Sequence, residues 1–367
     1  MYTQTDLDDA VAAGALSAEA AAALRAHIEA QRHTLVVDEE QFRLLTGFND
    51  IFVAIASAIL LFAVAWIGQR AGMALGLAIE GEGPSPLAGA AVAATAWGLA
   101  TYFTGRRRMA LPSILLLLAF VAGVFTAAGF ALVLMLGAAR IEDSPQVAGL
   151  LAAVAGAVAA GAAWLHWRRF RVPITVAAGA ASVVAIALGL LVAALGNAEN
   201  MRDIVLGFML LLGVGTFLVA MRWDSSDRAR LTRRSDVAFW LHLLAAPMIV
   251  HPVFTLLGLN DGQATLGEGF VVILLYIVLG IAALAIDRRA LLVSALAYVL
   301  WALTELFKQF GAVELSVALT ALVIGSALLL LSAFWNQARA AVVRPLPEGL
   351  QGRLPLIDRV VSPQPAA

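Results

Sequence analysis

The stretch 111–137, LPSILLLLAFVAGVFTAAGFALVLMLG, runs without a single charged side chain. A bilayer core is about 30 Å thick, and a helix that rises 1.5 Å per residue crosses it with roughly 20 apolar residues. The stretch is longer than that, so we expect the helix to tilt, or to bend below Pro112 or near Gly123 and Gly129. It predicts a transmembrane helix, and this decides the fold class of the chain.

The composition of the whole 367-residue chain agrees with that prediction, because 62% of the residues are hydrophobic and only 13% are charged. A soluble domain carries about twice that charged fraction. The mean hydropathy is +0.90, and the apolar residues lie in long blocks between short charged loops. We therefore expect an all-α, polytopic membrane protein with about ten transmembrane helices, in contact with the lipid bilayer.

Ten apolar blocks are long enough to be membrane spans. We place them at 50–68, 86–104, 111–137, 146–166, 173–196, 202–221, 236–258, 268–286, 290–307 and 313–335. The basic residues test this arrangement, because cytoplasmic loops are enriched in lysine and arginine. With ten spans, 20 of the 24 lysine and arginine residues fall on one side, whereas Arg70, Arg140, Arg202 and Lys308 fall on the other. Both termini are therefore predicted to be cytoplasmic.

The N-terminal sequence MYTQTDLDDA is acidic, and the first apolar block begins only near residue 50, which is unlike a cleaved signal peptide. We expect the first membrane helix to direct insertion, with the chain as a multi-pass protein of the cell inner (plasma) membrane. The abundance of alanine and the single lysine, Lys308, are typical of a GC-rich bacterial genome.

Three segments follow from this layout: a cytosolic helical segment at 1–48, a transmembrane domain at 49–335, and a flexible cytosolic tail with proline and arginine at 336–367. In the first segment, Gly14 suits the position after a helix and Ser17 suits the cap of a second helix. Asp38 with Gln41 forms a capping-box pattern. The second helix is not basic, so we expect the segment to dock on a protein partner or on the chain's own loops.

This N-terminal helical pair, with its turn AGALSAEAA and the many short-looped spans that follow, resembles bacterial predicted-membrane-protein families of unknown function that begin in the same way. The resemblance covers the N-terminal segment and the general layout. It implies a membrane protein with a short cytosolic helical segment, and it implies no particular activity.

The fourth span consists almost entirely of small residues. At a spacing of four they form two stripes, one with Ala148, Ala152, Gly156 and Ala160 and the other with Gly149, Ala153, Ala157 and Gly161. Small residues allow helix backbones to approach closely, which is how helices associate in lipid. We expect both stripes to be buried among neighbouring helices.

Ionisable side chains are costly inside a bilayer, so each of them needs a reason to be there. Most fall at span ends, and Asp287, which lies beside Arg288, is interpreted as interfacial. Three residues remain within the spans, namely His242, His251 and Glu305.

Span seven contains FWLHLLAAPMIVHP at 239–252. Pro247 removes a backbone donor, and His251–Pro252 is expected to end the regular helix early, so the span is predicted to be kinked and buried in protein. At 1.5 Å per residue, His251 and Glu305 lie roughly 22 and 24 Å from the cytoplasmic ends of their spans, which is a similar depth. His242 lies on the other side of the kink, on the opposite face of an ideal helix.

The candidate ligand-binding residues are therefore His251, Glu305, Trp301, Tyr298 and His242, with the helix kink at Pro247 and Pro252. Trp301 precedes Glu305 by one turn on the same face, and Tyr298 supplies a hydroxyl. In the alternative interpretation, His251 is a neutral imidazole that bonds to Glu305 or to a freed carbonyl and serves packing alone.

Two function classes remain open. The first is a carrier or channel-like protein for a small or lipidic solute, with a polar site near span seven. The second is a non-transporting scaffold or sensor that acts through its cytosolic segments. An enzyme is less favoured, because HExxH and GxSxG motifs are missing from the sequence. There is no cysteine, and we expect neither a metal, nor a cofactor, nor a nucleic-acid partner.

Overall fold

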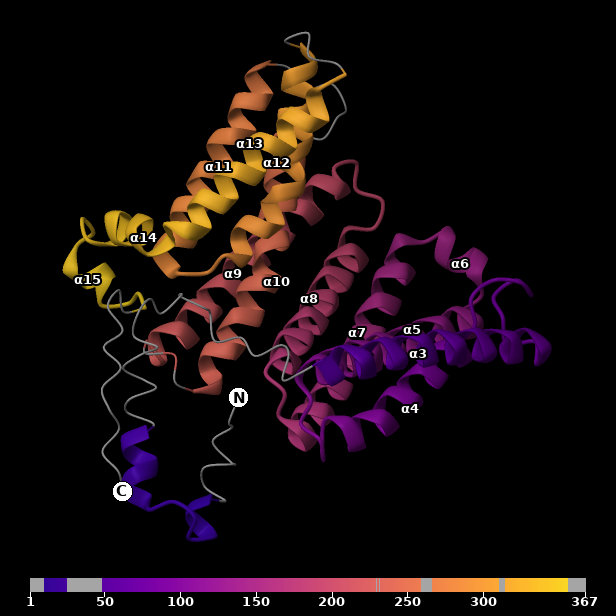
Figure 1. Cartoon of the computed structure of the whole chain (residues 1–367). Coiled ribbons are helices and arrows are strands. Elements are labelled where there is room, and N and C mark those ends of the chain that lie inside the picture. Colours follow the sequence, from indigo (N-terminus) through magenta and orange to yellow (C-terminus); the bar gives the residue numbers. More distant parts are fainter. Residues whose placement is uncertain are drawn as a thin grey trace. The chain divides into compact units, whose positions relative to one another are not determined.

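The computed structural model describes residues 10–24, 48–228, 230, 232–258, 266–309 and 314–355. These residues form helices, turns and connecting segments without any strand (Figure 1). By its contacts the chain separates into two units, Met1–Arg43 and Leu44–Ala367. The second unit carries the membrane helices.

In the first unit, helical turns at 10–12 and 18–24 flank a short connection. Gly14 has a φ of +71°, a conformation that costs glycine little. The Ser17 side chain accepts a hydrogen bond of 3.1 Å from the Ala20 backbone N–H, so the predicted cap of the second helix is confirmed. The capping-box pattern at Asp38 and Gln41 lies outside the described residues.

The second unit contains, in its described part, ten helices of 18 residues or more and three short ones. The long helices are α3 (Phe48–Ala74), α4 (Pro86–Phe103), α5 (Ala110–Leu136), α7 (Pro145–Phe170), α8 (Ile174–Leu195), α9 (Met201–Ser226), α10 (Arg233–Leu256), α11 (Leu266–Ile286), α12 (Ala290–Gln309) and α13 (Ser316–Ala333). The short helices are α6 (Ala138–Glu142), α14 (Trp335–Val343) and α15 (Glu348–Gln351). Each predicted span coincides with one long helix.

Eight of the described helices are long and apolar enough to cross a membrane. They include α3, α5, α7, α8, α9, α10 and α13, and residues Gly269–Ile286 of α11. The all-helical membrane fold is thus confirmed in its coarse form. The membrane crossing of α4 and α12, and with it the count of ten, stays a prediction.

Polar caps and glycines set the helix ends in the first half of this unit. The Ser85 and Ser144 side chains accept hydrogen bonds from the backbones of α4 and α7, and a proline follows each serine as the first helical residue. Gly137 ends α5 with a φ of +85°. Between these ends α5 runs as one helix through Gly123 and Gly129.

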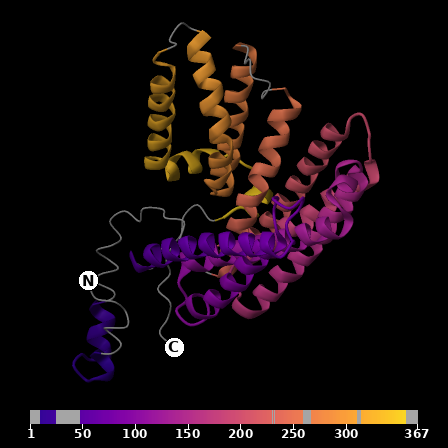
Figure 2. The same ribbon diagram turned by 90° about the vertical axis from the view of Figure 1, so that its right-hand side faces the viewer.

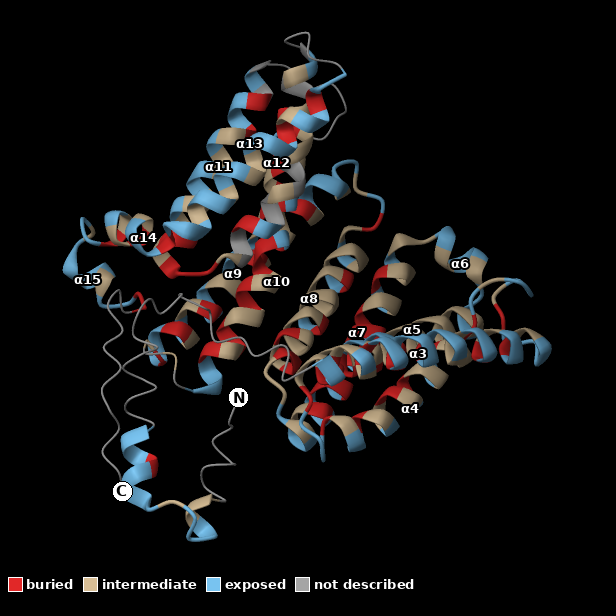
Figure 3. Ribbon diagram, in the orientation of Figure 1, coloured by how far each residue is buried: buried red, intermediate tan, exposed pale blue. Residues whose placement is uncertain are grey.

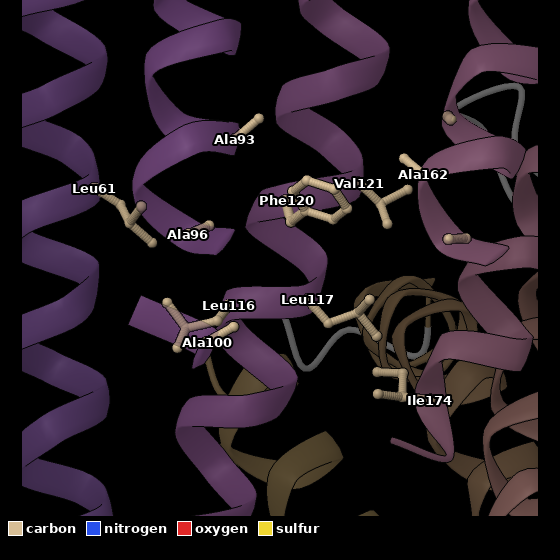
Figure 4. Packing of buried hydrophobic residues seen from close by; sticks show 12 residues of the cluster. Leu61, Ala93, Ala96, Ala100, Leu116, Leu117, Phe120, Val121, Ala162 and Ile174 are labelled. Atoms are coloured by element: carbon tan, nitrogen blue, oxygen red, sulfur yellow. The ribbon is translucent and has the colours of Figure 1, made fainter. Parts of the chain in front are cut away.

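The helices α3, α4, α5, α7 and α8 share one core (Figure 4). Leu116, Leu117 and Phe120 of α5 fill the space between alanines such as Ala96 of α4 and Ala163 of α7. Large side chains on the central helix thus meet small ones on its neighbours, and this lets the helices lie close together.

One close approach of backbones in this group is between α7 and α8. A Cβ atom added at Gly149 would lie 2.5 Å from the Gly189 carbonyl oxygen and from the Ala193 backbone nitrogen. Gly149, Ala153 and Gly156 are buried, so the predicted contact along the small residues is confirmed for this part of α7. Ala157 and Gly161 are exposed, and there the prediction was wrong. The small residues continue around the helix, but only one side of it meets α8.

The helices α9 to α13 form the second group. Figures 1 and 2 both show α11, α12 and α13 gathered together, and α12 contacts α10, α11 and α13. A cluster of Val250, Phe254, Val272, Val299 and Ala302 makes the core between α10, α11 and α12. Contacts of α8 with α9 and α10 join the two groups.

Among the eight apolar helices, α10 is the most deeply buried. Of its apolar 18-residue stretch 56% is buried, whereas the share in the other helices is 39% or less. Figure 3 shows buried residues along its length. The prediction that span seven is buried in protein is confirmed. The prediction that the helix ends at His251–Pro252 was wrong, because α10 continues to Leu256. Proline lacks only its own N–H, and the residues after it still bond to carbonyls of the preceding turn.

Candidate functional site

Asp224 is the centre of a buried polar cluster at one end of the second helix group. It lies in the last turn of α9, is 1% exposed, and has three polar contacts from other elements. His242 Nε2 of α10 lies 3.0 Å from Asp224 Oδ2. Arg288 Nη2 donates to Oδ1 at 2.5 Å and Arg288 Nε to Oδ2 at 3.3 Å. A guanidinium that contacts both carboxylate oxygens gives a directional, charge-assisted pair.

Arg288 extends this cluster to the start of α10. The residue lies in the turn between α11 and α12 and is 2% exposed. Its Nη2 also donates to the Ser235 carbonyl oxygen at 3.1 Å, and its guanidinium lies 5.8 Å from the ring centre of Phe239. One side chain therefore ties α9, α10 and the α11–α12 turn together.

His242 is fully buried within this cluster. Its ring meets Phe217 of α9 edge to face, with 5.1 Å between centroids. Because an ionised carboxylate only accepts hydrogen bonds, we assign the proton to Nε2, which faces Asp224. His242 Nδ1 is buried and has no hydrogen-bond partner in the described part of the chain. This imidazole is held on one side by Asp224 and on the other by packing.

A second buried carboxylate, Asp287, organises the neighbouring contacts. Its Oδ2 accepts from Arg230 Nη1 at 2.8 Å, and its Oδ1 accepts from the Trp335 indole N–H at 2.8 Å. Arg339 Nε lies 3.8 Å from the same Oδ1. Arg230 Nη2 also donates to the Ile286 and Asp287 carbonyl oxygens. Asp287 was interpreted as an interfacial residue, but its side chain is buried and makes contacts to α14.

The segment after α13 is held at this same end. Arg228 donates to the Leu354 and Gln351 carbonyl oxygens at 2.8 and 3.0 Å, and Arg339 donates to the Pro355 carbonyl oxygen at 2.7 Å. The sequence predicted a flexible tail at 336–367. Its first part instead forms α14 and α15 and is bonded to the α9–α10 connection, and residues 356–367 lie outside the described residues. We call this region, with the Asp224 and Asp287 clusters, the arginine-rich end.

A cavity of about 110 Å³ lies beside the Asp287 cluster, between α11, α12, α13 and α14. It is lined by Tyr276, Arg289, Leu292, Val293, Leu296, Leu328, Leu331, Ser332 and Trp335. Val293 is 64% exposed and Ser332 is exposed, so the cavity opens at these residues to the outside of the bundle. Trp335 belongs to both sites, because its ring lines the cavity and its N–H bonds to Asp287.

Two polar groups of this cavity lack hydrogen-bond partners among the described residues. They are the buried Tyr276 hydroxyl and the buried Arg289 Nε. The Arg289 guanidinium lies 4.7 Å from the ring centre of Trp335, within the range of a cation–π contact. The rest of the wall is aliphatic except for Ser332. The cavity thus combines a mainly apolar wall with one cation and two hydroxyls, of which that of Tyr276 is buried without a partner among the described residues.

The predicted site residues lie in different surroundings. His242 belongs to the Asp224 cluster, and His251 is exposed. Trp301 packs against the buried core between α10, α11 and α12. Pro247 and Pro252 both lie inside α10. The side chains of Glu305 and Tyr298 lie outside the described residues, so the pairing of His251 with Glu305 remains a prediction.

The sequence analysis did not predict that two buried carboxylates would gather arginine and tryptophan side chains at one end of the helices. The residues concerned are Asp224, Arg230, Arg288 and Trp335. We placed the end of span six at residue 221, so Asp224 fell in a loop, whereas α9 continues to Ser226. A usable signal was present: Asp224 and Asp287 each lie at a helix end close to arginines. Their partners are up to 64 residues away in the chain, and spacing alone does not reveal such pairs.

The fold defines the class: the chain is a multi-pass integral membrane protein. No family model, no curated protein sequence and no solved structure matches it significantly. Among the described residues, no group of three or more histidine, aspartate and glutamate side chains is placed to hold a metal ion. Function is therefore argued from the arginine-rich end and the cavity beside it.

Proposed function

We propose that this protein is a carrier for a lipidic solute, with ten membrane spans and both termini in the cytoplasm of a bacterial cell. The eight apolar helices support the membrane location, and the distribution of arginine supports the orientation. In this orientation the arginine-rich end faces the cytoplasm. The resemblance of the N-terminal segment to membrane-protein families of unknown function adds no activity.

The cavity between α11, α12, α13 and α14 is the observation that carries the proposal. Its wall consists mainly of leucine and valine, which suits a hydrocarbon chain and not a hydrophilic solute. Engineered apolar cavities of about 150 Å³ remain dry and bind benzene, so about 110 Å³ accepts a segment of an acyl chain. The remainder of such a ligand would extend through the opening at Val293 into the bilayer.

The Asp224 and Asp287 clusters serve this site as a frame. Their carboxylates are paired with arginines, and a buried pair fixes the geometry of the elements that supply it. Asp287 holds the indole of Trp335, and that indole forms one wall of the cavity. In this function His242 positions Asp224 and does not contact the solute.

A second candidate function is a non-transporting scaffold or sensor. It is favoured by one observation, the attachment of residues 335–355 to the α9–α10 connection through Arg228. This attachment gives the arginine-rich end an ordered surface that a protein partner can recognise. The N-terminal segment would then be a second docking element.

A reconstitution experiment separates the two functions. The purified full-length protein is placed in liposomes that contain a fluorescent phospholipid in one leaflet, and the exchange between leaflets is measured. We expect faster exchange than in protein-free liposomes. Equal rates in the two preparations would exclude lipid transport and leave the scaffold.

The matched pair Leu328→Trp and Leu329→Trp tests the cavity itself. Both residues belong to α13, but Leu328 lines the cavity, whereas Leu329 is 74% exposed on the outside of the bundle. We expect Leu328→Trp to lower the exchange rate by about tenfold and Leu329→Trp to change it by less than about twofold, because only the first fills the site. Equal effects would contradict the assignment of the cavity.

A further inference from the structure

We infer that the cavity between α11, α12, α13 and α14 is a binding site for an anionic phospholipid whose phosphate pairs with Arg289. The inference rests on the proposed function, and it adds the charge of the ligand and the residues that recognise it. The cavity supplies three features of such a site: an unshared cation, an apolar trough and a free hydroxyl. Each is considered in turn.

Arg289 differs from the neighbouring arginines. Arg288 is paired with Asp224, and Arg230 is paired with Asp287. Arg289 has no carboxylate partner among the residues that the structure describes, and its Nε is buried without an acceptor. A buried donor without an acceptor costs free energy, so this guanidinium is set up to receive an anion from outside the chain.

Trp335 holds the Arg289 guanidinium in place. The 4.7 Å contact with the indole ring orients the cation without using its N–H groups. The indole itself is fixed by its hydrogen bond to Asp287. A guanidinium stacked on a ring keeps its donors in a rigid fork, and this fork matches two oxygens of a phosphate group.

The apolar trough runs from Arg289 along α12. Arg289 directly precedes α12, and Leu292 and Leu296, four residues apart, lie on one face of that helix, so together they cover about 10 Å along its axis. Leu328 and Leu331 of α13 form the facing wall. A hydrocarbon chain placed in this trough begins next to the cation, as in an amphiphile with an anionic head.

Tyr276 supplies the third feature. Its hydroxyl is buried, lines the same small cavity and lacks a partner in the described part of the chain. A phospholipid carries ester carbonyl oxygens between its phosphate and its acyl chains, and these accept hydrogen bonds from a hydroxyl. One lipid molecule can therefore satisfy both Arg289 and Tyr276.

The location fits a lipid of the inner leaflet. In the proposed orientation, the α11–α12 turn lies at the cytoplasmic surface, where headgroups are found. Basic pockets between membrane helices on this side bind anionic headgroups. A zwitterionic lipid carries an ammonium group that a guanidinium does not attract, so the pairing favours a net negative headgroup.

Binding to defined lipids tests the inference. The full-length protein is reconstituted into nanodiscs with phosphatidylcholine and increasing amounts of phosphatidylglycerol, and the lipids retained after mild extraction are counted by native mass spectrometry. We expect phosphatidylglycerol to be retained in preference to phosphatidylcholine. Equal retention of the two lipids would overturn the inference.

Arg289→Gln is compared with Arg344→Gln, which removes an exposed arginine at the same end of the molecule. We expect the first to weaken phosphatidylglycerol binding about tenfold, the equivalent of one charge-assisted hydrogen bond, and the second by less than about twofold. Arg289→Lys should restore part of the preference, since it keeps the charge and loses the fork. Equal losses from the two glutamine variants would assign the effect to surface charge and overturn the site.

Leu328→Trp distinguishes failure of this inference from failure of the proposed function. If this variant loses both lipids while the wild type retains both equally, the cavity binds lipid without charge selection, and only the inference falls. If the wild type retains neither lipid, the proposed function falls with it. Tyr276→Phe is expected to weaken phosphatidylglycerol binding by about threefold to tenfold, as for a single neutral hydrogen bond.

Discussion

The two helix groups of this membrane protein are held together in different ways. In the first group, α7 and α8 approach so closely at Gly149 and Gly189 that neither position has room for a Cβ atom. In the second group, the buried carboxylates Asp224 and Asp287 connect helix ends through arginine and tryptophan. The α7–α8 contact brings two backbones together, whereas the second group combines a hydrophobic core between α10, α11 and α12 with polar contacts at its arginine-rich end. The cavity lies in the second group.

This contrast suggests a division of roles. A tightly packed interface of small residues resists distortion and suits a rigid support. The second group has, besides its hydrophobic core, a cavity between α11, α12, α13 and α14. The proposed lipid site, with its opening at Val293, lies in that cavity.

The largest effect is expected from Asp224→Asn. The variant leaves Arg288 buried without its carboxylate, and breaking one side of a buried ion pair costs about 3–5 kcal/mol. Thermal unfolding in detergent measures the loss. The matched control is Asp203→Asn at the exposed start of the same helix. Equal shifts in the two variants would mean that the Asp224 cluster does not hold the second group together.

Gly149→Leu should break the contact of the first group. The side chain would meet the α8 backbone, which cannot rotate away as a side chain can, and overpacking of this kind costs about 1–3 kcal/mol. Gly161→Leu on the same helix is the control, because a Cβ atom there meets open space. If both variants unfold at the same temperature, the α7–α8 contact is looser than the structure indicates.

Trp335→Phe sharpens the comparison within the second group. It keeps an aromatic ring beside Arg289 and removes the N–H that bonds to Asp287, a hydrogen bond to a charged group worth about 1.5–3 kcal/mol. We expect a lower unfolding temperature and weaker phospholipid binding, because the ring loses its anchor. The control is Trp66→Phe on the exposed side of α3, for which we expect an unchanged unfolding temperature. The same result for Trp335→Phe would show that the Asp287 contact contributes little.

The smallest effect is expected from His251→Ala. His251 is exposed, whereas His242 is fully buried against Asp224 and Phe217. His242→Ala opens a cavity and removes a contact of the Asp224 carboxylate, so it should destabilise the protein more than His251→Ala does. Unfolding measurements on the two variants test the order. The reverse order would return His251 to the centre of the candidate site.

The sequence by itself determined where the helices lie. A backbone in lipid must satisfy its own hydrogen bonds, so every long apolar run has to be helical, and each of the ten predicted spans coincides with a helix. The cap at Ser17 was predicted in the same way, since a cap is made with a residue only three positions away. The sequence was a weaker guide to which side of each helix meets its neighbour. Ala157 and Gly161 were expected to be buried, but they are exposed.

Only the tertiary structure decided which polar residues meet. Asp224 and Arg288 are 64 residues apart, and Trp335 is 48 residues from Asp287, so no local pattern connects them. The sequence directed attention to His251 because histidine in an apolar run is unusual. A charge at the end of a span looks like an ordinary interfacial residue, and its burial depends on whether another chain segment covers it. That covering is supplied by α14 and by the α11–α12 turn, and it arises from the packing of helices that the sequence only lists in order.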